Sequence, residues 1–415
     1  APRHAQLPRR LMPSSAVTPQ GALAGLRVLD LTRVLAGPWC GMLLGDLGAD
    51  VIKVESVASG DDTRAWGPPF VEGESAYFLG CNRNKRGICV DFGTPAGKHV
   101  LQHLLMGVDV VLDNFKTGTL ARWGFDDAWF ETHAPRLVRC SITGYGEEGP
   151  DAALPGYDFI LQAESGLMSI SGPQEGGATK YGVAIVDLAT GMMAANAVQA
   201  ALIARFRTDR GQKVEVCLYD TALALLANVG NSHLATGLED KRYGNGHPTI
   251  VPYTTFECAD ALIAIAVGND TQFARLAQLL GQPQWAQDPR FVRNADRVMN
   301  RQAIEELVAA STRVWQAEQL IQAMRQAGIP CGRVNTVSQA LSNPHTVARQ
   351  MVTLMQRHGR GEVKSLSSPL KLKGTPITVR HAPPALGEHT RQVLEQEFGF
   401  SAQQVDEWFA QGVVA

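Results

Sequence analysis

Asp187 is the residue whose type and surroundings offer the clearest chemistry in this sequence. It follows the apolar run 181–186, which predicts a strand, and it precedes the small residues 188–191, which predict the start of a helix. Aspartate is favoured at a helix N-cap because its carboxylate accepts hydrogen bonds from free backbone N–H groups. The same place favours the ionised carboxylate by about 0.3–1 kcal/mol, and an ionised carboxylate can attack an acyl carbon. Two compatible interpretations follow, a helix cap and a nucleophile or base.

Two neighbouring segments place polar and aromatic residues in loops. Segment 144–150 predicts a flexible glycine-containing loop at the end of a strand, and Tyr157 and Asp158 follow Gly156 just after a proline. Each pattern is also typical of an ordinary turn whose polar groups are satisfied locally. Position alone therefore leaves both segments open as structure or as site.

Basic residues gather in two further places. Segment 82–87 carries three cations ahead of a strand predicted at 88–91, and Lys116 follows Asn114 and Phe115 at the end of another strand, with Arg122 shortly beyond. Exposed loop cations are usually solvated, but they are also the groups that bind a phosphorylated cofactor. The phenyl ring of Phe115 is suited to flank an adenine.

Several well-known site motifs are missing. No G-x-G-x-x-G follows the first predicted strand and no G-x-x-x-x-G-K-S/T occurs, although Glu55 ends the second strand where a dinucleotide-binding protein holds a ribose. A dinucleotide-dependent dehydrogenase is therefore disfavoured. The absence of G-x-S-x-G and H-E-x-x-H likewise disfavours common hydrolase and metalloprotease sites.

The elements that must position these residues alternate between strand and helix. Strands are predicted at 28–31, 51–55, 108–112 and 137–142, with helices at 37–47 and 96–105. Such alternation predicts a doubly wound parallel sheet, whose ligands bind beyond the carboxyl ends of the strands. That rule directs attention to 32–37, 55–56, 114–115 and 143–145.

A smaller α+β domain is predicted in the second half. A long helix over 188–207 precedes a strand at 213–218 and a helix at 221–226. The polar, glycine-rich segment 243–248 then resembles a domain crossover. A hairpin at 254–267, helices at 271–280, 301–310 and 314–328, and a last helix at 390–398 follow. The expected division is a large domain over 21–225, a linker and small domain over 226–342, and a return segment over 343–415 that completes the large domain.

Composition narrows the class of protein. The chain has 415 residues, 45% of them hydrophobic, and a formal net charge of -2, so a nucleic-acid partner is not expected. We see no apolar run near the roughly 18 residues of a membrane span, and no membrane association is expected. Seven cysteines without a C-x-x-C pair disfavour zinc and disulfides, and Cys140 and Cys217 are predicted to be buried thiols.

Residues 1–20 differ from the rest of the chain. They contain Arg3, Arg9 and Arg10 and no acidic residue. This composition is typical of a mitochondrial targeting segment, and equally of a disordered tail. A mitochondrial matrix location is the expectation.

An ordered set of short motifs resembles the class III CoA-transferases, the CaiB/BaiF type that includes formyl-CoA transferase. The motifs are Gly25-Leu26-Arg27-Val28-Leu29-Asp30-Leu31, Ala36-Gly37-Pro38, Gly45-Asp46-Leu47-Gly48-Ala49-Asp50-Val51-Ile52-Lys53-Val54-Glu55, Asn84-Lys85-Arg86, Asp113-Asn114-Phe115, Gly144-Tyr145-Gly146, Asp187-Leu188-Ala189-Thr190-Gly191, Gly244-Asn245-Gly246-His247-Pro248 and Leu386-Gly387-Glu388-His389-Thr390. Each motif alone is modest, but the set runs in family order from about residue 22 to the end.

The resemblance implies a fold, an activity and a site. It implies an interlocked-ring homodimer with a Rossmann-like large domain built from both chain ends. It implies that Asp187 is the nucleophile, that CoA thioesters are the substrates, and that no cofactor or metal is bound permanently. The CoA-contacting positions of the family fall on Val34, Asn114, Phe115, Arg122, Tyr157 and Asp158. Its flexible loop over the substrate corresponds to Gly244, Asn245 and Gly246.

Departures from formyl-CoA transferase concern the acid substrate. This chain has Arg33 in place of histidine, Leu35 in place of glutamine and Ser56 in place of arginine. A guanidinium at position 33 is well suited to bind a distal carboxylate. The chain is most similar to the members that exchange CoA between succinyl-CoA and glutarate-type acids, so a dicarboxylic acid such as glutarate or hydroxymethylglutarate is the expected acceptor. Arg33 is equally suited to a structural role at a strand end.

Two other functions remain as alternatives. An α-methylacyl-CoA racemase has the same fold, but the racemases carry histidine where this chain has Tyr157, and a phenol is a poor acid or base near neutral pH. A non-catalytic acyl-CoA-binding protein is the second alternative, and it would not need an acid at Asp187.

Overall fold

The computed structural model describes residues 21–357 and 359–415. Within these residues the chain divides into two compact units. Unit 1 comprises 21–156, 187–218 and 351–415, and unit 2 comprises 157–186 and 219–350. The expected bounds differ from this division, because 157–186 precedes the expected crossover near residue 226 and yet packs with unit 2. The prediction for residues 1–20 lies outside the described residues.

A six-stranded parallel sheet forms the centre of unit 1, with the strand order β5-β2-β1-β6-β7-β8. The strands are β1 (Arg27–Asp30), β2 (Asp50–Glu55), β5 (Lys85–Cys89), β6 (Val110–Asp113), β7 (Val138–Thr143) and β8 (Lys213–Cys217). The predicted α/β class with a parallel sheet is confirmed. The strand order reverses between β1 and β6, so this pair forms the switch point at which doubly wound sheets bind ligands.

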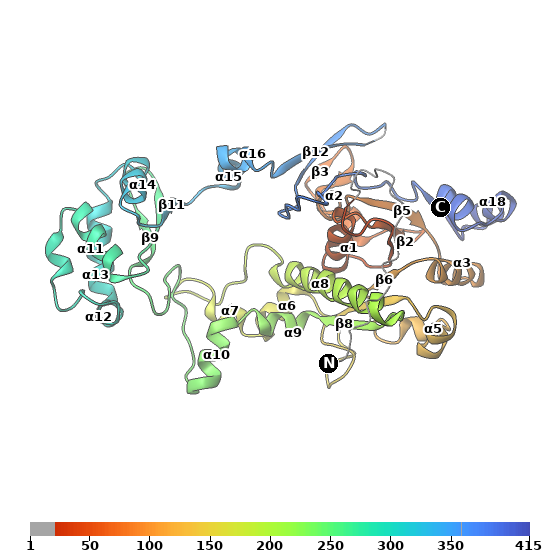
Figure 1. The fold of residues 1–415 in the computed structure, drawn as a ribbon, viewed down its shortest axis with the longest axis horizontal. Helices are drawn as coiled ribbons and strands as arrows, with labels where there is room; N and C mark the ends of the chain where they lie inside the picture. Colours follow the sequence, from red (N-terminus) through yellow and green to blue (C-terminus); the bar gives the residue numbers. More distant parts are fainter. Residues whose placement is uncertain (1–20, 358) are drawn as a thin grey trace, which may run out of the picture. The chain divides into compact units, whose positions relative to one another are not determined.

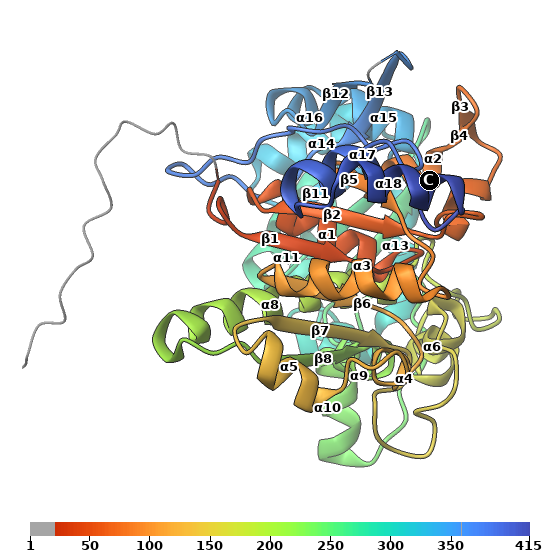
Figure 2. The ribbon, with the colours of Figure 1, turned by 90° about the vertical axis from the view of Figure 1, so that its right-hand side faces the viewer.

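Helices cover both faces of the sheet, as Figures 1 and 2 show: α1 and α8 lie on one face, and α3, α5 and the C-terminal helices on the other. Their bounds are α1 (Ala36–Asp46), α2 (Ala76–Cys81), α3 (Pro95–Met106), α4 (Thr119–Arg122), α5 (Asp127–His133), α8 (Ile185–Thr208), α17 (Thr390–Gln392) and α18 (Ala402–Ala410). Local signals set several of these ends. In α3, Thr94 caps the Gly97 N–H and Pro95 occupies the first turn, where its missing N–H costs nothing.

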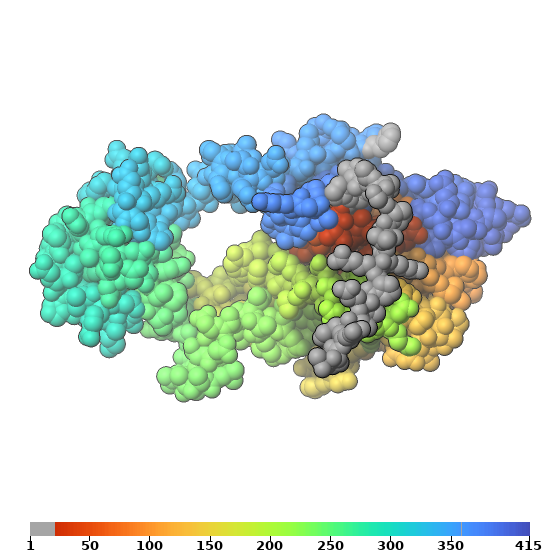
Figure 3. All heavy atoms as spheres, viewed as in Figure 1, coloured from red at the N-terminus to blue at the C-terminus, as the bar shows by residue number. Residues whose placement is uncertain are grey.

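The C-terminal segment completes the core of unit 1. Val393, Leu394, Val405 and Trp408 belong to the same buried cluster as Leu29 and Ile52 of the central strands. In Figure 3 the blue atoms of this segment lie against the orange atoms of α3. The helix expected over 390–398 consists of α17 followed by a π-helical stretch, Val393–Glu397, and α18 was not predicted.

Short elements join the main ones. Unit 1 also contains the 3-10 helix η1 (Asp62–Ala65) and two hairpins, β3 (Phe70–Val71) with β4 (Glu74–Ser75) and β12 (Val352–Gln356) with β13 (Glu362–Leu366). Cys140 and Cys217 are buried, as predicted.

Unit 2 has its own core around a three-stranded antiparallel sheet, ordered β11-β10-β9. Its strands are β9 (Tyr253–Glu257), β10 (Leu262–Ala266) and β11 (Cys331–Arg333), and β9 with β10 confirms the predicted hairpin. Its helices are α6 (Asp158–Glu164), α7 (Leu167–Ile170), α10 (Ala227–Thr236), α11 (Asp270–Leu279), α12 (Asn294–Met299), α13 (Arg301–Thr312), α14 (Ala317–Gln326), α15 (Val337–Ser342) and α16 (Pro344–Ala348), with the 3-10 helix η2 (Pro283–Ala286). Helix α9 (Leu218–Ala224) begins at the boundary between the units.

Two expectations about helix α8 are wrong. The run 181–186 is not a strand, because α8 begins at Ile185. A short apolar run cannot be distinguished from the first turn of a buried helix by periodicity. In addition, α8 has 24 residues and is long and apolar enough to cross a membrane, although we expected no such run. Half of its most apolar window is buried in the structure, and core helices of globular domains have the same length and composition.

Candidate active site at the carboxyl edge of the parallel sheet

The loop after β1 is locked to the end of β6. The Arg33 N–H donates to Asn114 Oδ1 at 3.0 Å, and Asn114 Nδ2 donates to the Arg33 carbonyl oxygen at 2.8 Å. One side chain therefore satisfies both backbone groups of Arg33 across the switch point of the sheet. The Asn114 amide, predicted to contact CoA, already uses its oxygen and one donor for this purpose.

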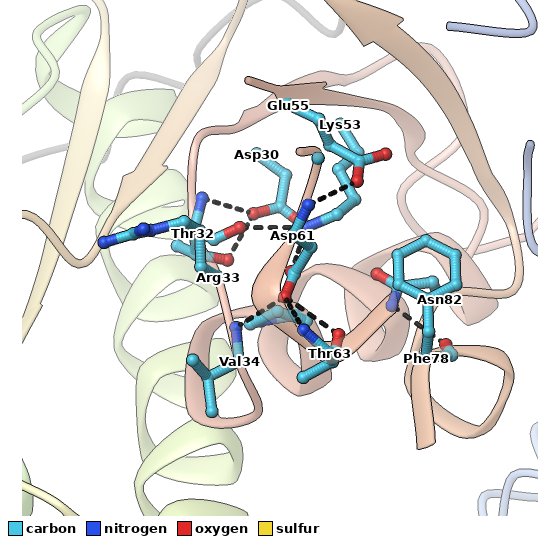
Figure 4. A network of polar contacts seen from close by, with 12 residues as sticks. Asp30, Thr32, Arg33, Val34, Lys53, Glu55, Asp61, Thr63, Phe78 and Asn82 are labelled. Atoms are coloured by element: carbon cyan, nitrogen blue, oxygen red, sulfur yellow. Dashed lines mark hydrogen bonds and ion pairs between the residues drawn. The ribbon is translucent and has the colours of Figure 1, made fainter. Parts of the chain in front are cut away.

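Val34 has a left-handed backbone conformation, with φ at 71°. This conformation is a genuine outlier for a β-branched residue, and such strain persists where the surroundings enforce it. Here the Val34 N–H donates to Asp61 Oδ1 at 3.2 Å, and Lys53 Nζ donates to the neighbouring Thr32 carbonyl oxygen at 2.9 Å. Figure 4 shows these contacts converging on the loop.

A buried ionic network under the loop supplies these contacts. Lys53 pairs with Asp61 at 2.9 Å and Lys85 pairs with Asp30 at 2.8 Å, with all four side chains fully buried. Burial by itself raises the pKa of Asp61, but the adjacent Lys53 ammonium outweighs it and holds that pKa at about 2. The pKa of Asp30 is also lowered, because Lys85 and Lys53 together outweigh the effect of burial. Both carboxylates are therefore ionised at neutral pH.

Glycine in α1 makes room for this network. A Cβ at Gly41 would lie 2.6 Å from Asp30 Oδ2 and 3.3 Å from Lys85 Nζ. Lys85 fills its three donor positions with Asp30, the Pro38 carbonyl oxygen and Asn82 Oδ1, each at 2.8 Å. A fully satisfied ammonium is the condition under which a buried charge is tolerated.

The basic segment 82–87 is neither a solvated loop nor an exposed phosphate-binding loop, contrary to both of our interpretations. Arg83 is bound through two nitrogens to Asp46, and Arg86 pairs with Asp50 and Glu397. Segment 82–86 is buried throughout, and Lys85 and Arg86 belong to β5. These cations meet acids from distant parts of the chain, which local composition does not reveal.

Glu55 is likewise engaged inside the protein. Arg64 donates to both of its carboxylate oxygens at 2.8 and 2.7 Å, and the Asp61 N–H donates to it at 2.9 Å. With both oxygens occupied, Glu55 is not arranged to hold a ribose. This agrees with the missing glycine motif.

The exposed cations lie instead at the end of β6. Lys116 and Arg122 are exposed, and Arg122 donates to the Thr117 carbonyl oxygen and to Thr119 Oγ1. Phe115 is half-buried and packs edge-on against Trp123, with ring centroids 5.2 Å apart. A cation pair beside a partly exposed ring at a strand end is the arrangement that a phosphorylated, adenine-containing ligand requires.

A pocket of about 200 Å³ lies beside these residues. Its lining includes Asp113, Phe115, Lys116, Ser141 and Lys213. Asp113 is 8% exposed, and burial raises its pKa to about 7. Sequence reasoning did not single out Asp113, because its position at the end of a strand gives no sign that burial outweighs the effect of Lys213 and Arg139.

Asp187 lies in the first turn of α8, half-buried, and is not its N-cap. One turn further on, Gly191 packs so closely on α1 that a Cβ there would lie 2.5 Å from the Ala36 carbonyl oxygen. Residues four apart share one face of a helix, so this contact places the first turn of α8 beside the loop formed by residues 32–36. Asp187 is thus close to the locked loop that carries Arg33.

Asp158 serves the beginning of α8. Its Oδ1 accepts a hydrogen bond of 2.8 Å from the Val186 N–H, and its Oδ2 accepts one of 2.7 Å from Gln162 Nε2. It therefore satisfies one of the free N–H groups at the N-terminus of α8 in the way expected of a cap. Tyr157, which precedes it, is 62% exposed.

The glycine segment 244–246 belongs to unit 2. Gly244 has a left-handed backbone with φ at 60°, and Asn245 Nδ2 donates to Thr255 Oγ1 at 3.0 Å. Arg301 fixes the residues that follow by donating to the carbonyl oxygens of His247 and Pro248 at 2.7 and 3.0 Å. The segment is thus anchored at its end, while Gly246 retains no side chain to restrict what approaches it.

Sequence reasoning also missed the acids that fix the loop. Asp61 caps η1 by accepting from the Thr63 N–H, and a local Asp-x-Thr pattern could have indicated that cap. Its pairing with Lys53 had no comparable local signal. Asp62, which forms an ion pair with Arg33 at 3.3 Å, was overlooked for the same reason.

Together these features define a doubly wound α/β enzyme with an aspartate beside a rigid loop at the switch point of its sheet. The family model described as CoA-transferase family III matches residues 23–390, and the chain belongs to that family. The resemblance inferred from the ordered motifs is therefore confirmed.

Two curated relatives and one solved structure are similar over most of the chain. The succinate–glutarate CoA-transferase of Agrobacterium fabrum is 41% identical over 90% of this chain and 95% of its own length. The succinyl-CoA:glutarate CoA-transferase of Mus musculus is 37% identical over 97% of this chain and 92% of its own length. The crystal structure of a CaiB/BaiF family protein from Brucella suis has a TM-score of 0.82 and 42% identity, covering 91% of this chain and 99% of that one.

Proposed function

We propose that this enzyme transfers CoA from succinyl-CoA to a dicarboxylic acid such as glutarate or hydroxymethylglutarate, with Asp187 as the nucleophile. The observation that carries the proposal is the place of Asp187 in the first turn of α8, next to the locked loop with Arg33. The helix N-terminus favours the ionised carboxylate that nucleophilic attack requires. The names of the two curated relatives support the choice of acids.

The reaction proceeds by successive acyl transfers through Asp187. Its carboxylate attacks the succinyl-CoA carbonyl, the thioester bond breaks, and an aspartyl–succinyl anhydride forms with release of CoA thiolate. The thiolate attacks the aspartyl carbonyl, which frees succinate and leaves an aspartyl-CoA thioester. The acceptor carboxylate attacks this thioester, which releases CoA thiolate and forms a second anhydride between Asp187 and the acceptor. The thiolate then attacks the acceptor's acyl carbon in this anhydride, which gives the new acyl-CoA and regenerates the Asp187 carboxylate. Each difficult exchange is thereby divided into easier steps.

Groups around Asp187 have distinct roles in this scheme. The cations Lys116 and Arg122 bind the CoA phosphates, with Phe115 against the adenine and Val34 beside the CoA, while Leu35 lies against the acid substrate. Arg33 binds the distal carboxylate of the acid. Exclusion of water from the site protects the anhydride from hydrolysis.

Replacement of Asp187 tests the proposal. Asp187→Asn removes the nucleophile but keeps the side-chain size, so we expect CoA exchange to fall by at least about 10³-fold while CoA binding persists. Hydroxylamine treatment during turnover should trap an adduct at Asp187, detectable by mass spectrometry. Asp406→Asn, on the exposed face of α18, is the matched control and should retain full activity. Full activity of Asp187→Asn would eliminate the mechanism.

A different measurement distinguishes the racemase alternative from CoA transfer. A racemase exchanges the α-proton of a 2-methylacyl-CoA with solvent, whereas acyl transfer leaves that proton in place. We expect no deuterium incorporation at the α-carbon during turnover in D₂O. Rapid incorporation without CoA exchange would replace the proposal by racemisation.

We also propose that the active form is an interlocked homodimer. Helix α8 exposes the large apolar side chains of Met193, Ile203 and Phe206 by 51%, 55% and 77%, and burying such side chains against a partner is favourable. Light scattering after size-exclusion chromatography should give twice the chain mass, and a monomer at working concentrations would refute it.

The mitochondrial matrix location stays a prediction. Similar relatives come from a bacterium and from an animal, so family membership by itself does not favour an organelle.

A further inference from the structure

The guanidinium of Arg33 already holds a carboxylate of this chain. Arg33 Nη1 lies 3.3 Å from Asp62 Oδ2, and the two side chains are 55% and 51% exposed. The contact is long and engages one nitrogen, whereas a guanidinium binds a well-placed carboxylate through two. Arg33 therefore retains the donors to bind a better-placed carboxylate from solution.

Both partners of this ion pair stand on fixed backbone. Asn114 binds the N–H and the carbonyl oxygen of Arg33. Asp62 begins η1 directly after Asp61, whose carboxylate caps that helix and pairs with buried Lys53. The side chains can therefore separate while their backbones stay in place, which is what exchange of one carboxylate for another requires.

The adjacent residues Asp61 and Asp62 have different partners. Asp61 is buried and accepts from Lys53, from the Val34 N–H and from Thr63. Asp62 is 51% exposed and contacts the exposed guanidinium of Arg33. Asp61 therefore stabilises the structure, whereas Asp62 contacts Arg33, the residue predicted to bind the substrate.

We propose that Asp62 is a specificity-determining residue: its carboxylate occupies Arg33 until the distal carboxylate of a dicarboxylic substrate displaces it. This inference rests on the proposed function. A monocarboxylic acid has no second carboxylate to exchange, so the Arg33–Asp62 ion pair stays intact and Arg33 does not contribute to binding of the acid. A dicarboxylic acid forms the closer, two-nitrogen contact and releases Asp62 to water.

The size of the effect follows from the exposure of the pair. Exposed ion pairs shift equilibria by about two- to five-fold, and salt screens them. Asp62→Asn should therefore lower KM for glutarate and for succinyl-CoA about two- to five-fold at low ionic strength, with the gain shrinking as salt is raised. Inhibition by free CoA, which has no such carboxylate, should not change.

A comparison of single and double variants distinguishes two causes of a lower KM. One is displacement of Asp62 from Arg33, and the other is general repulsion between Asp62 and an anionic substrate. In the Arg33→Leu background, Asp62→Asn should have no further effect on KM for glutarate, because no guanidinium remains for Asp62 to occupy. Asp62→Glu keeps the charge and should behave like the parent enzyme, and thermal melting of every variant controls for folding. A higher KM in Asp62→Asn, or an equal gain with and without Arg33, would overturn the inference.

Measurements on the unmodified enzyme distinguish failure of the proposed function from failure of the role proposed for Asp62. Absence of CoA exchange between succinyl-CoA and labelled glutarate in the unmodified protein would refute the proposed function. Exchange in the unmodified protein together with additive effects of the two substitutions would refute the role of Asp62 and leave the function standing.

Discussion

Two clusters of cations in unit 1 have similar compositions and opposite environments. The cations of 83–86 are buried and each is paired with acids, whereas Lys116 and Arg122 are exposed at the end of β6. The first group joins β5 and the segment before it to α1, β1 and β2. The second is available to a ligand. Partners, and not residue type, decide whether a cation supports the structure or binds a substrate.

Removing a buried cation is expected to have the largest effect. Lys85→Met leaves the Asp30 carboxylate buried without its ammonium, and losing one partner of a buried pair costs about 3–5 kcal/mol. Urea denaturation should show this loss in the free energy of unfolding. The control Lys116→Met should stay within about 0.5 kcal/mol of the parent protein. Equal losses of unfolding free energy at both positions would contradict the distinction between buried and exposed cations.

Asp113 provides the opposite case, a carboxyl whose burial outweighs the effect of Lys213 and Arg139 on its pKa. Its pKa is raised from 3.8 to about 7, which corresponds to about 4 kcal/mol at 1.36 kcal/mol per pKa unit. Since the folded protein favours the protonated form, stability falls as the pH rises from about 4 to about 7. Asp113→Asn stays neutral, so its unfolding free energy should exceed that of the parent protein at pH 8 and lose this advantage by pH 4.

Asp61 should show the reverse dependence on pH. Its folded pKa of about 2 lies below the usual 3.8, so its contribution is present above about pH 4 and is lost as the pH falls toward 2. The difference corresponds to about 2 kcal/mol. Asp61→Asn should therefore destabilise the protein at pH 7 and have a smaller effect near pH 2, measured by thermal melting. A pH-independent difference would contradict the pairing with Lys53.

The smallest effect on stability is expected at the exposed cluster. Arg122→Ala removes no buried partner, so the unfolding free energy should change by less than about 0.5 kcal/mol. KM for succinyl-CoA should nevertheless rise about three- to ten-fold, because one charge-assisted contact to a phosphate is lost. Arg122→Lys should recover part of this loss. An unchanged KM would place the CoA phosphates elsewhere.

Much of the fold could be predicted because its signals are local. The apolar runs that form β1, β2 and β7 alternate with helical patterns, and the turn at 259–261 separates β9 from β10. The ordered motifs identified the family and predicted Asp187 as its nucleophile. Element ends were less certain: α8 begins two residues before Asp187, since an apolar run suits a strand and a helix equally.

The sequence by itself determined the class of fold, the family and the acid at position 187. Only the tertiary structure decided which charges are buried, because Asp30 meets Lys85 and Asp50 meets Arg86 across strands far apart in the chain. It also placed Asn114 on the Arg33 backbone and Asp158 on the first turn of α8. The cost of burying a charge depends on the partner that folding brings to it, and no local pattern records that partner.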